Sequence, residues 1–113
     1  MRKNIVAGNW KMNTTVAEGV ELAKAVVEKS AQVPEGVGLI IATPFTHLVP
    51  VSEVVKGTRV ELSAENCADK EKGAYTGEVS APMLKSIGVE YVIIGHSERR
   101  QYFAETDETV NKK

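Results

Sequence analysis

The hydrophobic pattern along the 113 residues switches repeatedly between two periods. Short apolar runs bounded by glycine, proline or polar residues predict strands over 4–7, 37–42, 59–64 and 90–94. Apolar residues at helical spacing and capping signals predict helices that begin near residues 15, 46, 80 and 106. Strand and helix thus alternate almost four times, which indicates an α/β chain with parallel strands and right-handed crossovers.

The expected helix boundaries depend on capping residues. Residues 15–18 have the S/T-x-x-E form of a capping box, and Gly57 is a natural stop for the second helix. Ser80 caps a short third helix with Pro82 in its first turn, and Thr106 with Asp107 begins the fourth. A doubly wound sheet fits this alternation as well as a barrel does. No G-x-G-x-x-G follows the first strand, so a dinucleotide-binding fold has no support.

The most informative stretch is residues 91–100, where the apolar run from Tyr91 to Ile94 leads into Gly95 and His96. A continuous apolar run indicates a buried parallel strand, so His96 is expected at the strand end, with a turn or a helical start after it. Backbone N–H groups there favour a neutral imidazole, which donates a hydrogen bond to a carbonyl without losing its proton. On these residues alone, a core or helix-capping histidine is the favoured interpretation.

Two further motifs change that interpretation. Residues 5–13 repeat the pattern of an apolar strand, a glycine and polar residues that include Lys11, and residues 74–78 read Ala-Tyr-Thr-Gly-Glu. Together with residues 91–100, in this order and at this spacing, they resemble the triosephosphate isomerase family over 1–113. The resemblance implies the N-terminal half of a TIM (β/α)8 barrel, about four parallel βα units. Family barrels have about 250 residues, so we expect 1–113 to be an N-terminal portion truncated in the fourth helix.

The resemblance also implies site residues and their roles. Asn9 would hydrogen-bond the oxygens of a phosphorylated triose, and Lys11 would place positive charge near the phosphate and the developing oxyanion. His96 would polarise the substrate carbonyl, Ser97 would contact the base, and Glu98 would orient Lys11. The pairing of a neutral histidine with a glutamate base is this family's established pattern and is not worked out from these residues. A solvated lysine and a structural Glu98 are the simpler alternatives.

The loop over 66–78 has a different expected role. In the family this loop enters the neighbouring subunit of a dimer, so the resemblance makes Tyr75 and Thr76 interface residues. A mobile, solvent-exposed loop is the alternative. We expect Trp10 to serve packing, and His47 to lie on the surface or at a helix start.

The family's catalytic glutamate and phosphate-binding loops follow later strands of the barrel. We therefore expect isomerase activity, which interconverts dihydroxyacetone phosphate and glyceraldehyde 3-phosphate in glycolysis and gluconeogenesis, to need a complementing C-terminal half. One alternative is an inactive half-barrel, natural or engineered, that folds or self-associates as a structural module. An anion-binding module built on Lys11 is a third hypothesis.

Composition narrows the remaining classes. The formal net charge of −1 gives no electrostatic case for nucleic acid or an anionic membrane, and the apolar runs are too short to cross a bilayer. Cys67 is the one cysteine, so an internal disulfide or a cysteine-based metal site is excluded. We expect a cytoplasmic protein without cofactor or metal, and either a homo-oligomer or a partner of a complementing half.

Overall fold

The computed structural model describes residues 2–113 and contains four strands and five α-helices in that range. The strands are β1 (Asn4–Asn9), β2 (Val37–Thr43), β3 (Val60–Ala64) and β4 (Tyr91–Val92). The helices are α1 (Val16–Lys29), α2 (Leu48–Val55), α3 (Ala81–Ser86), α4 (Ser97–Tyr102) and α5 (Asp107–Lys112). Short 3-10 turns cover Ser30–Gln32 and Phe45–His47.

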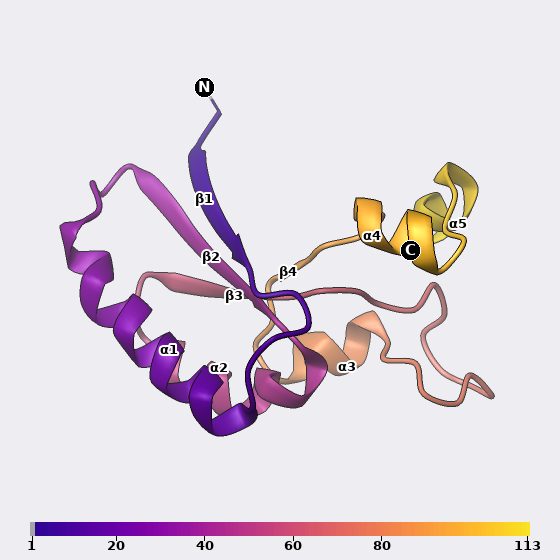
Figure 1. Cartoon of the computed structure of the whole chain (residues 1–113), viewed down its shortest axis with the longest axis horizontal. Helices are drawn as coiled ribbons and strands as arrows, with labels where there is room; N and C mark the ends of the chain where they lie inside the picture. The colour runs from indigo at the N-terminus through magenta and orange to yellow at the C-terminus, as the bar shows by residue number, and fades with distance from the viewer. Residues whose placement is uncertain (1) are drawn as a thin grey trace.

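The four strands form one parallel sheet in the sequential order β1-β2-β3-β4. The register places Ile5 beside Gly38, Leu39 beside Val60, and Ser63 beside Tyr91. Figure 1 shows α1, α2 and α3 on one side of this sheet, with α4 and α5 beyond the carboxyl ends of the strands. A doubly wound sheet would carry helices on both faces, so this arrangement confirms the half-barrel.

The hydrophobic core lies between the sheet and the helices that cover it. Alternate residues of β2 and β3 point toward this layer, as the period of two requires. Their partners on α1 and α2 are small or branched, which lets the two helices pack close to the strands. The buried members are Ala23, Ile41, Leu48, Val51, Val55, Val60, Leu62, Ala64, Cys67, Leu84 and Val89.

The outer strands are less buried than the sequence predicts. The run over 90–94 was expected to be a buried strand, but β4 spans two residues, and Tyr91 and Ile94 are exposed. β4 pairs with β3 alone, and after Ile93 N donates to Ala64 O the chain turns away from the sheet. β1 is the other edge, and its Ile5 and Val6 side chains are 48% and 60% exposed.

The helix ends agree with the capping signals. Thr15 and Glu18 form the expected capping box of α1, and Ser80 caps α3 by accepting from Met83 N. α2 begins at Leu48, later than expected, because a 3-10 turn occupies 45–47. His47 lies at this helix start as predicted, but it is 3% exposed, so the surface alternative is wrong.

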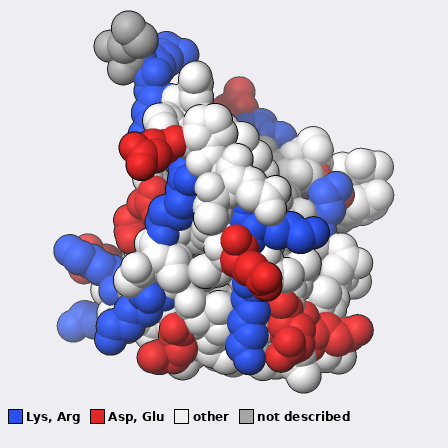
Figure 2. Space-filling view, turned by 90° about the vertical axis from the view of Figure 1, so that its left-hand side faces the viewer, with Lys and Arg blue, Asp and Glu red and all other residues white. Residues whose placement is uncertain are grey.

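Charged side chains of both signs are interspersed on the face shown in Figure 2, so that face carries no patch of a single sign. Over residues 2–113, no helix combines the length and apolar composition needed to cross a bilayer.

Arg59 fixes the connection between α1 and β2. Its guanidinium donates to four backbone carbonyls, those of Ser30 (3.0 Å), Val33 (2.6 Å), Pro34 (2.8 Å) and Val37 (2.8 Å). Carbonyls in such a turn can accept a second hydrogen bond, as those of Ser30 and Pro34 do here beyond their bonds from Val33 N and Val37 N, and the planar fork of arginine can reach several carbonyls at once. One side chain thus ties the entry of β2 to β3.

Replacing Arg59 with methionine is expected to lower the unfolding free energy by about 2 to 4 kcal/mol, because hydrogen bonds to a charged donor contribute about 1.5 to 3 kcal/mol each and part of the loss is recovered by water. Urea unfolding at fixed protein concentration measures the change. Lys85→Met is the matched control, since Lys85 is exposed on α3 and its loss also removes one positive charge. Equal urea midpoints for Arg59→Met and Lys85→Met would show that the hydrogen bonds of Arg59 do not stabilise the fold.

Candidate active site

The carboxyl ends of the strands gather the residues that the motifs single out. Asn9 ends β1, and His96 follows β4. Asn9, Lys11, His96 and Glu98 line one pocket of about 160 Å³. Parallel strands bring their carboxyl ends to one edge of a sheet, which explains why segments distant in sequence meet here.

Lys11 and Glu98 form an ion pair across this pocket. The Lys11 Nζ donates to Glu98 Oε1 at 2.7 Å, although the residues are 87 positions apart. The hydrogen bond from Lys11 lowers the pKa of Glu98, and the positive charge of Lys11 acts in the same direction. The side chains are 50% and 45% exposed, so the pair orients Lys11 more than it stabilises the fold. The Lys11 N–H also donates to Asn9 Oδ1 at 3.0 Å.

His96 is the N-cap of α4. Its Nδ1 accepts from the backbone N–H of Glu98 at 3.0 Å, in place of the usual oxygen of a capping side chain. An Nδ1 that accepts carries no proton, so a neutral ring holds its proton on Nε2. His96 therefore has one nitrogen fixed by the helix and the other available as a hydrogen-bond donor.

Three of the residues predicted from the sequence lie elsewhere. Ser97 is exposed in the first turn of α4 and is not among the residues that line this pocket. Tyr75, which is 48% exposed, lines a separate hollow on the loop after β3, and Thr76 is exposed on the same loop. Figure 1 shows this loop extending away from the sheet.

Glu65 is a pocket residue that the sequence analysis missed. It follows β3 directly and lines the pocket beside Lys11. Burial raises the pKa of Glu65 to about 7. A hydrogen bond from the Lys11 backbone opposes this shift, whereas the negative charge of Glu98 adds to it. Its Oε2 is buried without a hydrogen-bond partner among the described residues. The available signal was its position, an acidic residue immediately after a strand at the edge where site residues collect.

Arg99 also lines the pocket, and contacts with Glu105 and Phe103 fix its side chain. Its Nε donates to Glu105 at 2.7 Å, and its guanidinium lies 4.7 Å from the centre of the Phe103 ring. Lys113 reaches the same Glu105 carboxylate at 2.6 Å and Asn66 Oδ1 at 2.7 Å. Burial alone would raise the pKa of Glu105, but the hydrogen bonds from Lys113 and Arg99 outweigh it and lower that pKa. This network links α4 and α5 to the loop after β3.

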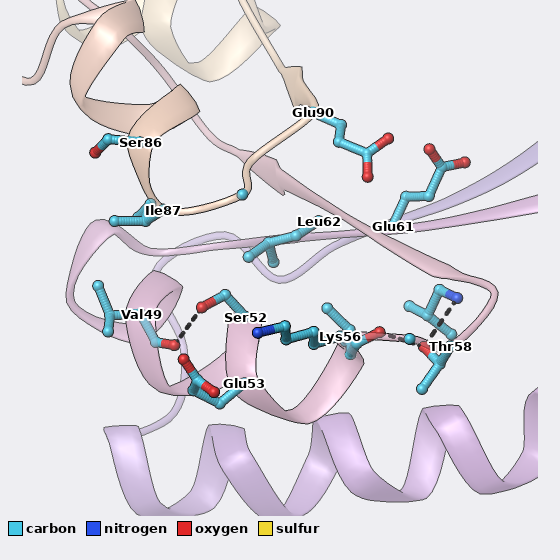
Figure 3. Close-up of a pocket in the computed structure, with 14 residues that line it drawn as sticks. Val49, Ser52, Glu53, Lys56, Thr58, Glu61, Leu62, Ser86, Ile87 and Glu90 are labelled. Atoms are coloured by element: carbon cyan, nitrogen blue, oxygen red, sulfur yellow. Dashed lines mark hydrogen bonds between the residues drawn. The ribbon is translucent and has the colours of Figure 1, made fainter.

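A larger hollow of about 580 Å³ lies between α2, the start of β3 and the turn before β4. Figure 3 shows the Glu61 and Glu90 carboxylates facing each other there, and the proximity of Glu61 raises the pKa of Glu90. Among the described residues, no group of three or more His, Cys, Asp or Glu is arranged to hold a metal ion. None of the motif residues lines this hollow, so the smaller pocket is the candidate site despite its size.

A parallel βα half-barrel with its polar site at the carboxyl ends of the strands places this chain in the class of (β/α)8-barrel proteins. The family model described as Triosephosphate isomerase matches residues 4–113. The chain therefore belongs to the triosephosphate isomerase family.

Curated relatives share this family name. The triosephosphate isomerase of Bacteroides fragilis is 57% identical over 113 residues, which is all of this chain and 45% of the relative. Those of Porphyromonas gingivalis (55% over 113 residues; 100% and 45%) and Acetivibrio thermocellus (55% over 112 residues; 99% and 44%) are similar to the same extent. The chain spans less than half of the length of these relatives.

Glu65 makes stability depend on pH. Its folded-state pKa of about 7 lies above its ordinary value of 4.5, so the folded state binds more protons between these values. The unfolding free energy should fall as pH rises from about 4.5 to about 7. Glu65→Gln should remove this decline and raise the unfolding free energy at pH 8 by about 1 to 2 kcal/mol, since it removes a partly buried negative charge.

Urea unfolding between pH 5 and pH 8 checks this expectation. Glu28→Gln is the control, because Glu28 is exposed on α1 and its removal changes the net charge equally. Parallel curves for the parent chain and Glu65→Gln would show that Glu65 does not titrate in this range.

Proposed function

We propose that residues 1–113 supply the lysine and histidine part of a triosephosphate isomerase active site, which interconverts dihydroxyacetone phosphate and glyceraldehyde 3-phosphate. The observation that carries the proposal is the ion pair between Lys11 and Glu98, with His96 beside it in one pocket. The family membership of the chain supports the same conclusion. The pathway context would be glycolysis and gluconeogenesis, in the cytoplasm.

The reaction moves a proton between two adjacent carbons, which together form the enediolate intermediate. A base removes the proton next to the carbonyl, and the oxygen that gains negative charge must be stabilised as this occurs. In the proposed mechanism the His96 Nε2–H donates to that oxygen, and Nδ1 stays bound to the Glu98 N–H. Asn9 would hydrogen-bond substrate oxygens, and Ser97 would contact the base, which a later strand of the barrel would supply.

Lys11 would contribute fixed positive charge. Its contact with Glu98 is half exposed, so the ammonium can turn toward a phosphate at little energetic cost. Glu98 keeps the ammonium at the pocket mouth while the site is empty of substrate. The lysine therefore would act on binding as well as on the transition state.

The edges of the sheet support a proposal about assembly. Ile5 and Val6 expose apolar surface on β1, and exposed parallel strands tend to acquire partners. We propose that a complementing C-terminal half covers this surface. Tyr75 and Thr76, on the loop that extends from the sheet, would contact a second subunit of a homodimer, and the exposure of Tyr75 supports this.

The activity is tested by joining residues 1–113 to the C-terminal remainder of the Bacteroides fragilis relative and assaying isomerisation. We expect turnover by this chimera and none by the 113 residues alone. His96→Gln should lower kcat about 10²-fold with little change in KM, as loss of one oxyanion donor does, whereas Lys11→Met should lower kcat and raise KM. Lys24→Met, on the exposed face of α1, is the control for charge.

A folded chimera without turnover would overturn the proposed function. Near-normal kinetics for either variant would remove the role given to that residue while leaving the function in place. Circular dichroism of each variant separates loss of chemistry from loss of folding.

Residues 1–113 on their own are expected to self-associate or to bind a hydrophobic dye, because each exposed Val or Ile that becomes buried contributes about 1.5 to 3 kcal/mol. Light scattering against concentration measures this. Ile5→Lys should weaken self-association, whereas Leu22→Lys, an exposed apolar position on α1, should not. A monomer that melts cooperatively and binds no dye would contradict the expectation.

A further inference from the structure

His47 is a buried histidine that the proposed mechanism does not use. It lies at the start of α2 and is 3% exposed. Its ring meets the loop that follows β1: Nε2 is 3.1 Å from Thr14 O and 3.0 Å from Thr14 Oγ1. The edge of the Trp10 ring faces it, with the ring centres 6.5 Å apart and the planes at 81°.

The partners of the ring decide which nitrogen donates. A carbonyl oxygen only accepts, so Nε2 must carry a proton and donate to Thr14 O. Nδ1 is 2.8 Å from Thr46 Oγ1, whose hydroxyl can donate to it. A neutral ring with its proton on Nε2 therefore satisfies both nitrogens, as a buried polar group requires.

The loop that His47 contacts has a strained backbone. Lys11 and Thr14 have φ values of 59° and 71°, the left-handed region that residues other than glycine rarely adopt. Such conformations persist only where surrounding contacts hold them. Asn9 and Asn13 provide two such contacts, from Lys11 N to Asn9 Oδ1 and from Asn13 Nδ2 to Trp10 O. Both contacts come from within the strand end and the loop, whereas His47 belongs to a different connection.

The position of the ring is itself fixed by close packing. Gly19 of α1 faces it, and a Cβ atom at Gly19 would come within 2.5 Å of His47 Cδ2 and 3.2 Å of the Trp10 ring. The imidazole thus has no room to move toward α1. The Thr14 carbonyl therefore accepts from His47, and the position of the His47 ring is itself fixed by its packing against Gly19.

We propose that His47 is a positioning residue for Lys11. By holding Thr14, it keeps the strained loop in the conformation that presents the Lys11 ammonium to Glu98 and to the pocket of His96. The catalytic consequence of this proposal rests on the proposed function, whereas the effect on the loop does not.

Two substitutions separate the hydrogen bond from the volume of the ring. His47→Phe keeps a flat ring between Trp10 and Gly19 but removes the donor to Thr14. His47→Gln keeps an amide donor near the position of Nε2. Val51→Ala is the matched control, because it loosens the packing of the helix that His47 precedes and removes no hydrogen bond to the loop.

In the 113-residue chain, hydrogen–deuterium exchange of the Lys11 amide, which donates to Asn9 Oδ1, should be accelerated about ten-fold or more by His47→Phe, and much less by His47→Gln or Val51→Ala. Unchanged exchange in His47→Phe would overturn the proposal whatever the enzymatic activity. Equal acceleration by all three variants would overturn it too, since the effect would then reflect general loosening.

In the chimera, His47→Phe should lower kcat/KM about ten-fold, with a rise in KM and a fall in kcat that resemble a weaker form of Lys11→Met. When Lys11→Met is already present, His47→Phe should cause no further loss, because its effect passes through Lys11. If His47→Phe lowers kcat/KM by the same factor with and without Lys11→Met, His47 does not act through Lys11. An inactive parent chimera would instead count against the proposed function, and the exchange experiment would still decide the role of His47.

Discussion

The parallel pairing of β1, β2 and β3 is the constraint from which the rest of the molecule follows. Because these strands are parallel and follow one another in sequential order, right-handed crossovers all return across the same face, and α1, α2 and α3 cover that face. The same direction gathers the strand ends, so Asn9, Glu65 and His96 come to one edge although they are far apart in the chain. The arrangement of the strands that forms the fold therefore also brings the site residues together.

The site combines supports of different strength. The contact between Lys11 and Glu98 is half exposed and contributes little to stability, so the place of the lysine depends on the backbone that carries it. That backbone is strained, whereas His47, which contacts it, is buried and has a hydrogen-bond partner at each ring nitrogen. The Lys11 side chain is thus held by a weak, exposed ion pair, while its backbone is held by buried groups. This combination suits a side chain that must turn toward a substrate.

Capping residues and apolar runs were sufficient to predict the order of elements from the sequence. Thr15 and Ser80 cap the helices as expected, and the segment after His96 is helical. The length of β4 was not predictable, because an apolar run does not reveal that its strand pairs on one side only. Glu65 was missed, and the burial of His47 was not foreseen, for a related reason: burial arises from neighbours distant in sequence, and periodicity contains no information about them.

The guanidinium of Arg59 has a consequence for how this chain can vary. Its two terminal nitrogens donate to carbonyls spread over residues 30–37, and all four hydrogen bonds can form only if this segment has its present length. An inserted or deleted residue there would carry carbonyls out of reach and shift the entry of β2. Among the described residues, no side chain donates to several backbone carbonyls of the loop over 66–78, so this loop can accept changes in length at lower cost. Homologous sequences should therefore differ in length over 66–78 far more often than over 30–37.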